Sequence, residues 1–284
     1  MTAVAVSVVL ISFAGTTEEN LAAARELGFR FVQLRNVGTD LTVAALTPQR
    51  REELRNQLRK NGLGLSSLSG GYGPLLESGK TGERIEAERR LTRLAGELGC
   101  RYVTGHIGSL RDADFRRKPE FMQSMTAWIK EMELRGLVFA IESGSEHGER
   151  LRELIDFFDS PSLRVNLDPA NFLFYGFDVL SSCDALYDVS VHFHCKDARK
   201  RLAVDAASES SVPGFPDARY ADEVRAGSGD VPFARILPEL VRRGVVQVAA
   251  VERESGPHRR EDVLAGKRLL EAYFGCVGTE EQGG

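Results

Sequence analysis

The feature that most constrains the fold is a regular alternation between two hydrophobic periodicities. Short runs rich in β-branched and aromatic residues alternate with longer amphipathic stretches, most of which end at glycine, as helices commonly do. The predicted strands are residues 4–13, 29–35, 64–70, 100–105, 137–143, 163–168, 189–196 and 245–252. The predicted helices are residues 16–28, 47–61, 81–98, 115–135, 148–158, 178–187, 231–243 and 261–274. Because parallel strands need a crossover helix for each return, this order predicts parallel strands covered by helices.

Two architectures fit this alternation: a closed (β/α)₈ TIM barrel and an open, doubly wound sheet. The sequence of 284 residues is close to the length of about 250 that one barrel needs. The segment 13–16 after the first strand holds a single glycine, so the phosphate-binding loop typical of the doubly wound fold is missing. No composition break divides the chain. We therefore expect a single α/β barrel domain over residues 1–284.

One connection is much longer than the others. Residues 197–230 lie between the seventh strand and its helix, and a loop of this length without secondary structure is uncommon in a compact domain. The connection leaves the barrel at the face where the active sites of such barrels lie. We favour a lid over a disordered insertion, and we expect Arg199 or Lys200 on it to reach an anionic substrate.

Charge and cysteine usage narrow the range of partners. The formal net charge is −4, whereas nucleic-acid-binding domains usually carry a basic surplus, so no nucleic-acid partner is expected. The four cysteines form no CxxC pair and no disulfide framework, which is typical of reduced thiols in a cytoplasmic protein. The longest apolar stretch, residues 4–14, is too short to span a bilayer, and we expect no membrane association.

Acidic and imidazole side chains close four successive predicted strands. Side chains alternate between the two faces of a strand, and this parity directs Glu142, Asp168 and Glu252 into the barrel, together with His192 and His194. A lone glutamate at a strand end is usually a solvated charge. Several carboxylates that share one lumen need cations or a metal, because isolated buried charges cost several kcal/mol each. Such a ligand set suits one divalent ion, namely Mn²⁺, Mg²⁺, Co²⁺ or Zn²⁺, with the identity left open.

The motifs around these residues resemble those of a known superfamily. They are IES at 141–143, NLDPAN at 166–171, HFHCKDA at 192–198, GSGDVPF at 227–233 and VERES at 251–255. In this order they resemble the xylose isomerase-like TIM barrels, and more narrowly the sugar phosphate isomerase/epimerase branch. The resemblance implies that the metal ligands are Glu142, Asp168, His194 and Glu252.

The resemblance also implies the roles of further residues. Glu142 and Glu252 are expected to be the acid/base pair on either side of the substrate carbon. His106 and Lys196 are expected to contact the substrate or to support the ligands. Asn171 replaces the histidine of the DxxH motif found in the tagatose-type epimerases and the apurinic-site endonucleases of this superfamily, and we place it among the substrate-binding residues.

The function implied is a metal-dependent sugar or sugar-phosphate isomerase/epimerase. A carboxylate removes the proton next to a carbonyl, the metal stabilises the enediolate, and the proton returns elsewhere. The alternatives are a keto-polyol (inosose-type) dehydratase, an apurinic-site endonuclease-like hydrolase and a non-catalytic carbohydrate-binding barrel. Asn171 and the small number of histidines, five in all, argue against the endonuclease. The expected partner is a small carbohydrate, and homo-oligomerisation is left open.

Overall fold

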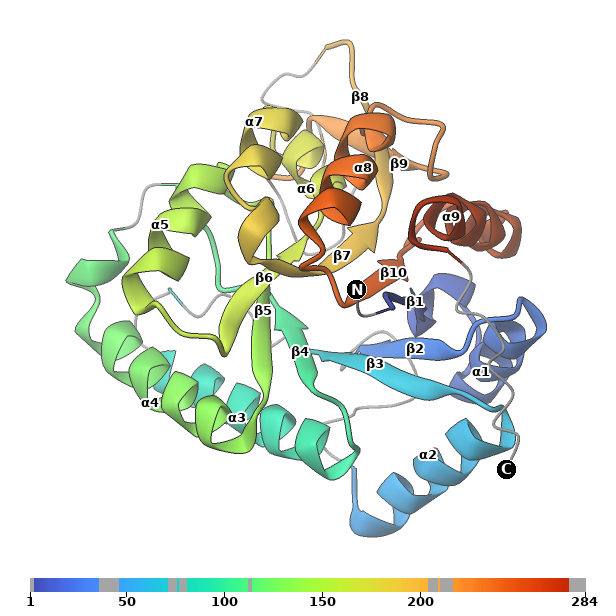
Figure 1. The fold of residues 1–284 in the computed structure, drawn as a ribbon, viewed down its shortest axis with the longest axis horizontal. Helices are drawn as coiled ribbons and strands as arrows, with labels where there is room; N and C mark the ends of the chain where they lie inside the picture. The colour runs from blue at the N-terminus through green and yellow to red at the C-terminus, as the bar shows by residue number, and fades with distance from the viewer. Residues whose placement is uncertain are drawn as a thin grey trace.

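The computed structural model describes residues 3–35, 46–70, 76, 81–111, 114–203, 209 and 217–275. Eight parallel strands close into a barrel in the order β1-β10-β7-β6-β5-β4-β3-β2 (Figure 1). The strands are β1 (Ala5–Val9), β2 (Phe31–Arg35), β3 (Gly64–Ser69), β4 (Tyr102–Gly105), β5 (Val138–Glu142), β6 (Leu163–Leu167), β7 (Ser190–Cys195) and β10 (Val248–Val251). The predicted (β/α)₈ barrel is confirmed, and the doubly wound alternative is wrong.

Helices surround the barrel and connect its strands (Figure 1). They are α1 (Thr17–Glu26), α2 (Pro48–Lys60), α3 (Thr81–Glu97), α4 (Pro119–Arg135), α5 (Gly148–Phe158), α6 (Pro169–Phe174), α7 (Val179–Asp184), α8 (Phe233–Arg243) and α9 (Arg259–Phe274). Their starts follow the expected capping chemistry. Thr16 forms a capping box with Glu19 at the start of α1, and proline occupies the first turn of α2, α4 and α6.

The barrel lumen has three layers. Its floor is a small apolar cluster of Tyr102, Val138 and Val248, separate from the large core between strands and helices. Buried polar residues fill the middle layer, where the Ser67 hydroxyl lies 3.1 Å from His192 Nε2. The charged residues lie at the mouth, at the carboxyl ends of the strands. The charged residues of the lumen are thus gathered at one level, where they can compensate one another.

Three segments differ from the sequence-based prediction. The predicted first strand ends at Val9 and continues as a 3₁₀ turn over Leu10–Phe13. Helix α6 was not predicted, although Asp168 and Pro169 form an ordinary N-cap and first helical position. The connection at residues 197–230 contains a two-stranded antiparallel sheet of β8 (Asp197–Lys200) and β9 (Ala221–Val224). Residues 204–208 and 210–216 of this connection lie outside the described part of the chain.

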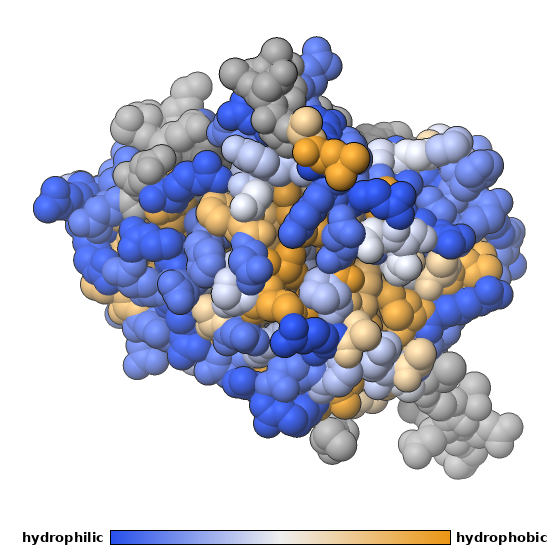
Figure 2. Space-filling model, turned by 90° about the horizontal axis from the view of Figure 1, so that it is seen from above, coloured by the Kyte–Doolittle hydropathy of each residue, from blue (hydrophilic) through white to orange (hydrophobic). Residues whose placement is uncertain are grey.

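The surface of the molecule is more polar than its interior. The face shown in Figure 2 is mainly hydrophilic, with hydrophobic residues confined to smaller areas. In the described part of the chain, none of the helices combines the length and the apolar character needed to cross a membrane.

Candidate metal centre and active site

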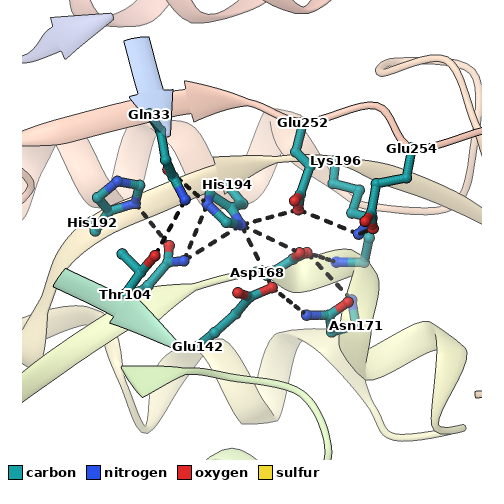
Figure 3. Close-up of polar contacts among 12 residues, drawn as sticks. Gln33, Thr104, Glu142, Asp168, Asn171, His192, His194, Lys196, Glu252 and Glu254 are labelled. Atoms are coloured by element: carbon teal, nitrogen blue, oxygen red, sulfur yellow. Dashed lines mark hydrogen bonds and ion pairs between the residues drawn. The ribbon is translucent and has the colours of Figure 1, made fainter. Parts of the chain in front are cut away.

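A network of hydrogen bonds in the barrel interior orients the His194 ring (Figure 3). Nε2 of this ring lies 3.2 Å from the side-chain oxygen of Gln33, which in turn donates through its amide nitrogen to Thr104 Oγ1 at 3.2 Å. The Asn166 side chain bridges the two histidines, because its oxygen lies 2.9 Å from His192 Nδ1 and its nitrogen lies 3.2 Å from His194 Nε2. With Nε2 held on this side, Nδ1 of His194 faces the mouth of the barrel.

Three carboxylates surround that Nδ1 atom. It lies 3.1 Å from Glu252 Oε2, 3.6 Å from Glu142 Oε1 and 3.8 Å from Asp168 Oδ2. One ligand atom from each of the four side chains lies within 4.8 Å of all the others, and all four residues are buried. The structure therefore brings together the four residues that the resemblance implied as ligands.

Asp168 shows how the local fold prepares this cluster. Its Oδ1 caps α6, accepting hydrogen bonds from the backbone N–H groups of Ala170 at 3.0 Å and Asn171 at 3.3 Å. Its Oδ2 is buried, faces the cluster and has no hydrogen-bond partner among the described residues. A buried carboxylate oxygen in this position is costly unless a cation satisfies it. The donor set and this oxygen fit a divalent ion held by Glu142, Asp168, His194 and Glu252.

The four residues converge although they do not lie at one level of the sheet. Strand pairing aligns Glu142 with Asn166 and Asn166 with His192, so Asp168 and His194 lie two residues further along their strands. Strands in a barrel are tilted and staggered, which lets side chains from different register positions meet at one point. The ligand atoms therefore meet at one point although their residues occupy different register positions.

Charge coupling within the cluster sets the protonation states of the protein without metal. Burial raises the pKa of Glu142, but His106 and His194 outweigh it and hold this pKa well below its usual range. Burial likewise raises the pKa of Glu252, and Lys196 together with His194 brings it well below its usual range. Burial lowers the pKa of His194, but Glu252 and Glu142 raise it well above its ordinary value. These shifts favour the ionised form of both glutamates and the imidazolium form of His194, in which both ring nitrogens carry a proton.

Metal binding is expected to release about one proton per ion near neutral pH, because the ion replaces the proton on His194. Since the pKa of His194 is raised, apparent metal affinity should increase with pH, by up to about tenfold per pH unit, until the pH passes that pKa. Calorimetric titration of Mn²⁺ in two buffers of different ionisation enthalpy measures the released protons. Binding without proton release at pH 7 would contradict this assignment.

A pocket opens above the cluster at the mouth of the barrel. Its lining residues are Arg35, His106, Glu142, Asn171, Phe174, Tyr175, Lys196, Ala218, Glu252 and Glu254. Three of the four predicted substrate-binding residues are in this set. Asn171 donates to Glu142 Oε1 at 3.2 Å and to the Ser143 carbonyl at 3.1 Å, so it fixes the position of that carboxylate.

The fourth residue, Arg199, lies elsewhere. Its guanidinium donates to the carbonyl of Ser228, near the end of the connection at residues 197–230. Arg199 is not among the residues that line the pocket. Strands β8 and β9 form a separate two-stranded sheet, and Arg199 is exposed on it. The structure thus separates Arg199 from the other predicted site residues.

Several pocket residues were not identified from the sequence. Phe174 and Tyr175 line the pocket because α6 follows directly on Asp168. The sequence signal that could have revealed this helix is Asp168 as its N-cap followed by Pro169. Ala218 comes from the connection at residues 197–230, so this segment contributes to the pocket. Gln33 supports His194 from across the barrel, and no local sequence pattern indicates this contact.

A closed (β/α)₈ barrel with three carboxylates and an imidazole converging at its carboxyl-terminal mouth defines a barrel with a candidate divalent-metal site. The chain belongs to the xylose isomerase-like TIM barrel family, because the model of that family matches residues 21–273. No curated protein sequence matches the chain significantly.

Solved structures with the same fold are similar over almost the whole chain. A xylose isomerase domain protein from Planctomyces limnophilus is 19% identical, with a TM-score of 0.76 over 97% of this chain and 99% of its own. A xylose isomerase-like TIM barrel protein from Mycobacterium smegmatis, in complex with magnesium, is 16% identical, with a TM-score of 0.71 over 95% and 98%. A probable 3-DHS dehydratase from Bacillus anthracis is 19% identical, with a TM-score of 0.71 over 95% and 98%.

Two other structures of this fold are described as a D-tagatose 3-epimerase-like protein and an L-ribulose 3-epimerase, each with a TM-score of 0.69. At 16% and 14% identity, they show a shared fold. Enzymes of more than one reaction type are thus similar to this chain, and the site itself must carry the functional argument.

Proposed function

We propose that the protein is a metal-dependent sugar isomerase or epimerase that transfers a proton at the carbon next to a carbonyl group. The observation that carries this proposal is the pair of glutamates, Glu142 and Glu252, whose carboxylates approach one point from strands separated by β6 and β7. Both open onto the same pocket. Two ionised carboxylates at one reacting carbon can remove a proton and deliver it back to a different position.

The surrounding residues give each glutamate a defined position. Asn171 donates to Glu142 Oε1, and His106 Nε2 lies 3.5 Å from the same oxygen. Lys196 Nζ lies 3.3 Å from Glu252 Oε2. Both glutamates are buried, and both line the pocket. Such positioning supports proton transfer, which requires an approach within hydrogen-bond distance.

Carboxylates whose pKa values are lowered are weak bases, and a proton next to a carbonyl is only weakly acidic. A divalent ion held by Glu142, Asp168, His194 and Glu252 would supply Lewis-acid polarisation of the substrate carbonyl. The residues of the chain then hold the substrate, remove its proton to a carboxylate oxygen and return that proton. A barrel that only binds carbohydrate does not need four converging ligands.

The test is exchange of substrate hydrogen with solvent. The protein with Mn²⁺ is incubated with a panel of ketoses in deuterated water, and deuterium is located by NMR. We expect label at the carbon next to the carbonyl, and no label after treatment with EDTA. Label accompanied by an epimer or isomer supports the proposal, whereas loss of water from the labelled sugar would identify a dehydratase. A panel without any metal-dependent label would reject proton transfer as the function.

A further inference from the structure

One carboxylate at the pocket mouth has no part in the proposed metal site or proton transfer. Glu254 follows β10 and lies between the two cations that line the pocket. Its Oε2 accepts from Lys196 Nζ at 2.6 Å, and its Oε1 pairs with the Arg35 guanidinium (Figure 3 shows the contact with Lys196). Arg35 reaches Glu252 only at 4.0 Å. Glu254 is therefore the main partner of Arg35 and the nearest partner of Lys196.

The backbone of Glu254 is held in place from the neighbouring sheet. Its N–H donates to Glu223 Oε1 on β9 at 2.8 Å. Glu223 in turn pairs with Arg253 at 3.3 Å, and Arg253 pairs with Asp262 on α9 at 2.9 Å. Arg253 and Glu223 have side chains that are almost fully buried. The carboxylate of Glu254 is thus presented to the two cations by a fixed ion-pair network.

The formal charges of the pocket balance when a divalent ion is counted. Four carboxylates and two cations make up the charged groups, with histidines taken as neutral. These groups are Glu142, Asp168, Glu252, Glu254, Lys196 and Arg35. A divalent ion at the cluster supplies the two remaining positive charges. A phosphoryl or carboxylate group on a substrate would add negative charge to a neutral pocket whose cations already have partners.

Other cations nearby are directed elsewhere. Among the described residues, Arg199 donates to Ser228 and Arg111 donates to the carbonyl of Tyr175 at 3.4 Å. In the internal segments outside the described residues, the sequence contains Lys80 as the only lysine or arginine. Two further arginines beside Glu254 also have partners of their own: Arg259 donates to the carbonyls of Ile11 and Glu254, and Arg253 pairs with Glu223 and Asp262.

We infer that Glu254 is a specificity-determining residue. It occupies the place of a substrate anion on Arg35 and Lys196, so the site accepts an uncharged polyhydroxy carbonyl compound and rejects its phosphate ester. This inference deepens the proposed function and rests on it for the identity of the reaction. The pairing of Glu254 with the two cations is a property of the chain itself and can be measured without turnover.

The probe is inorganic phosphate, titrated into the Mg²⁺-loaded protein and followed by calorimetry. Glu254→Ala removes the internal anion, and we expect it to bind phosphate at least about tenfold more tightly than the wild type, as charge-assisted hydrogen bonds to two cations allow. Glu254→Gln keeps the size of the side chain and carries the test if the alanine variant does not fold. Adding Arg35→Met to Glu254→Ala should remove the gain.

Asp222→Asn is the matched control, since it removes one negative charge and the ion pair between Asp222 and Arg201, which lies outside the pocket. It should bind phosphate as weakly as the wild type. Wild-type affinity equal to that of Glu254→Ala would overturn the inference, and so would an equal gain in Asp222→Asn.

The same ketose panel links the inference to the reaction. Unphosphorylated ketoses should exchange their hydrogen in preference to the corresponding phosphate esters, and Glu254→Gln should narrow this difference. If phosphate binding behaves as expected but no ketose exchanges, the proposed function fails and the role of Glu254 stands. If ketoses exchange but Glu254→Ala and Glu254→Gln gain no phosphate affinity, only the role of Glu254 is rejected.

Discussion

Replacing Glu142 or Glu252 with glutamine is expected to lower metal-dependent hydrogen exchange by about 10² to 10⁴-fold at saturating metal, the range that a positioned acid or base contributes. Each glutamine keeps the shape of the side chain and one neutral oxygen, but it cannot accept a proton. Both carboxylates are buried beside His194 and open onto the pocket, where they can approach the reacting carbon. The measurement is deuterium incorporation into the ketose that the wild type labels most rapidly.

Metal content separates the two roles of these residues. Glutamine is also a weaker ligand than glutamate, so each variant is titrated with Mn²⁺ and assayed at a concentration that saturates its own site. Glu149→Gln is the control, because Glu149 lies at the start of α5 with a side chain that is 78% exposed. A Glu142→Gln or Glu252→Gln variant that keeps wild-type exchange once loaded would show that this glutamate is not the base.

The architecture and the convergence of the four candidate ligands could be predicted from the sequence because both follow from periodicity. Alternation along a strand determines which side chains enter the lumen, and parallel strands place their carboxyl ends at one mouth. Glu142, Asp168, His194 and Glu252 each follow this rule. The sequence motifs added the choice of His194 over His192, which parity alone cannot make because both residues face inward.

The remaining features depend on contacts that periodicity does not encode. Arg199 was predicted to reach the substrate from the connection at residues 197–230, yet it lies exposed on the β8–β9 sheet and donates to the Ser228 carbonyl. The pairing of Glu254 with Arg35 joins residues 219 positions apart, and side-chain packing rather than local pattern decides it. Asp168 shows that one residue can have two roles. The sequence analysis identified it as a metal ligand, but it did not identify it as the N-cap of α6.

Gly144→Ala is expected to destabilise the protein by about 3 kcal/mol or more, the combined scale of overpacking and backbone strain. Gly144 has φ of +128°, and a Cβ atom at this position would lie 2.0 Å from Asn171 Cβ and 2.9 Å from the Asn171 carbonyl carbon. The loop after β5 and the first turn of α6 would have to separate. Because Asn171 holds Glu142 through a hydrogen bond of 3.2 Å, this separation should also weaken Mn²⁺ binding.

Thermal unfolding monitored by circular dichroism should show a Tm lower by roughly 6–12 °C, given about 2–4 °C per kcal/mol for a domain of this size. Gly96→Ala provides the matched control. Gly96 is an exposed residue of α3, and a Cβ atom there would have its nearest contact at 3.6 Å, an ordinary separation from Leu137. Alanine is more favourable than glycine within a helix, so the free energy of unfolding of this variant should be unchanged or higher by up to about 1 kcal/mol. Equal stability of Gly144→Ala and Gly96→Ala would mean that the close approach of Gly144 to α6 does not hold Asn171 and Glu142 in place.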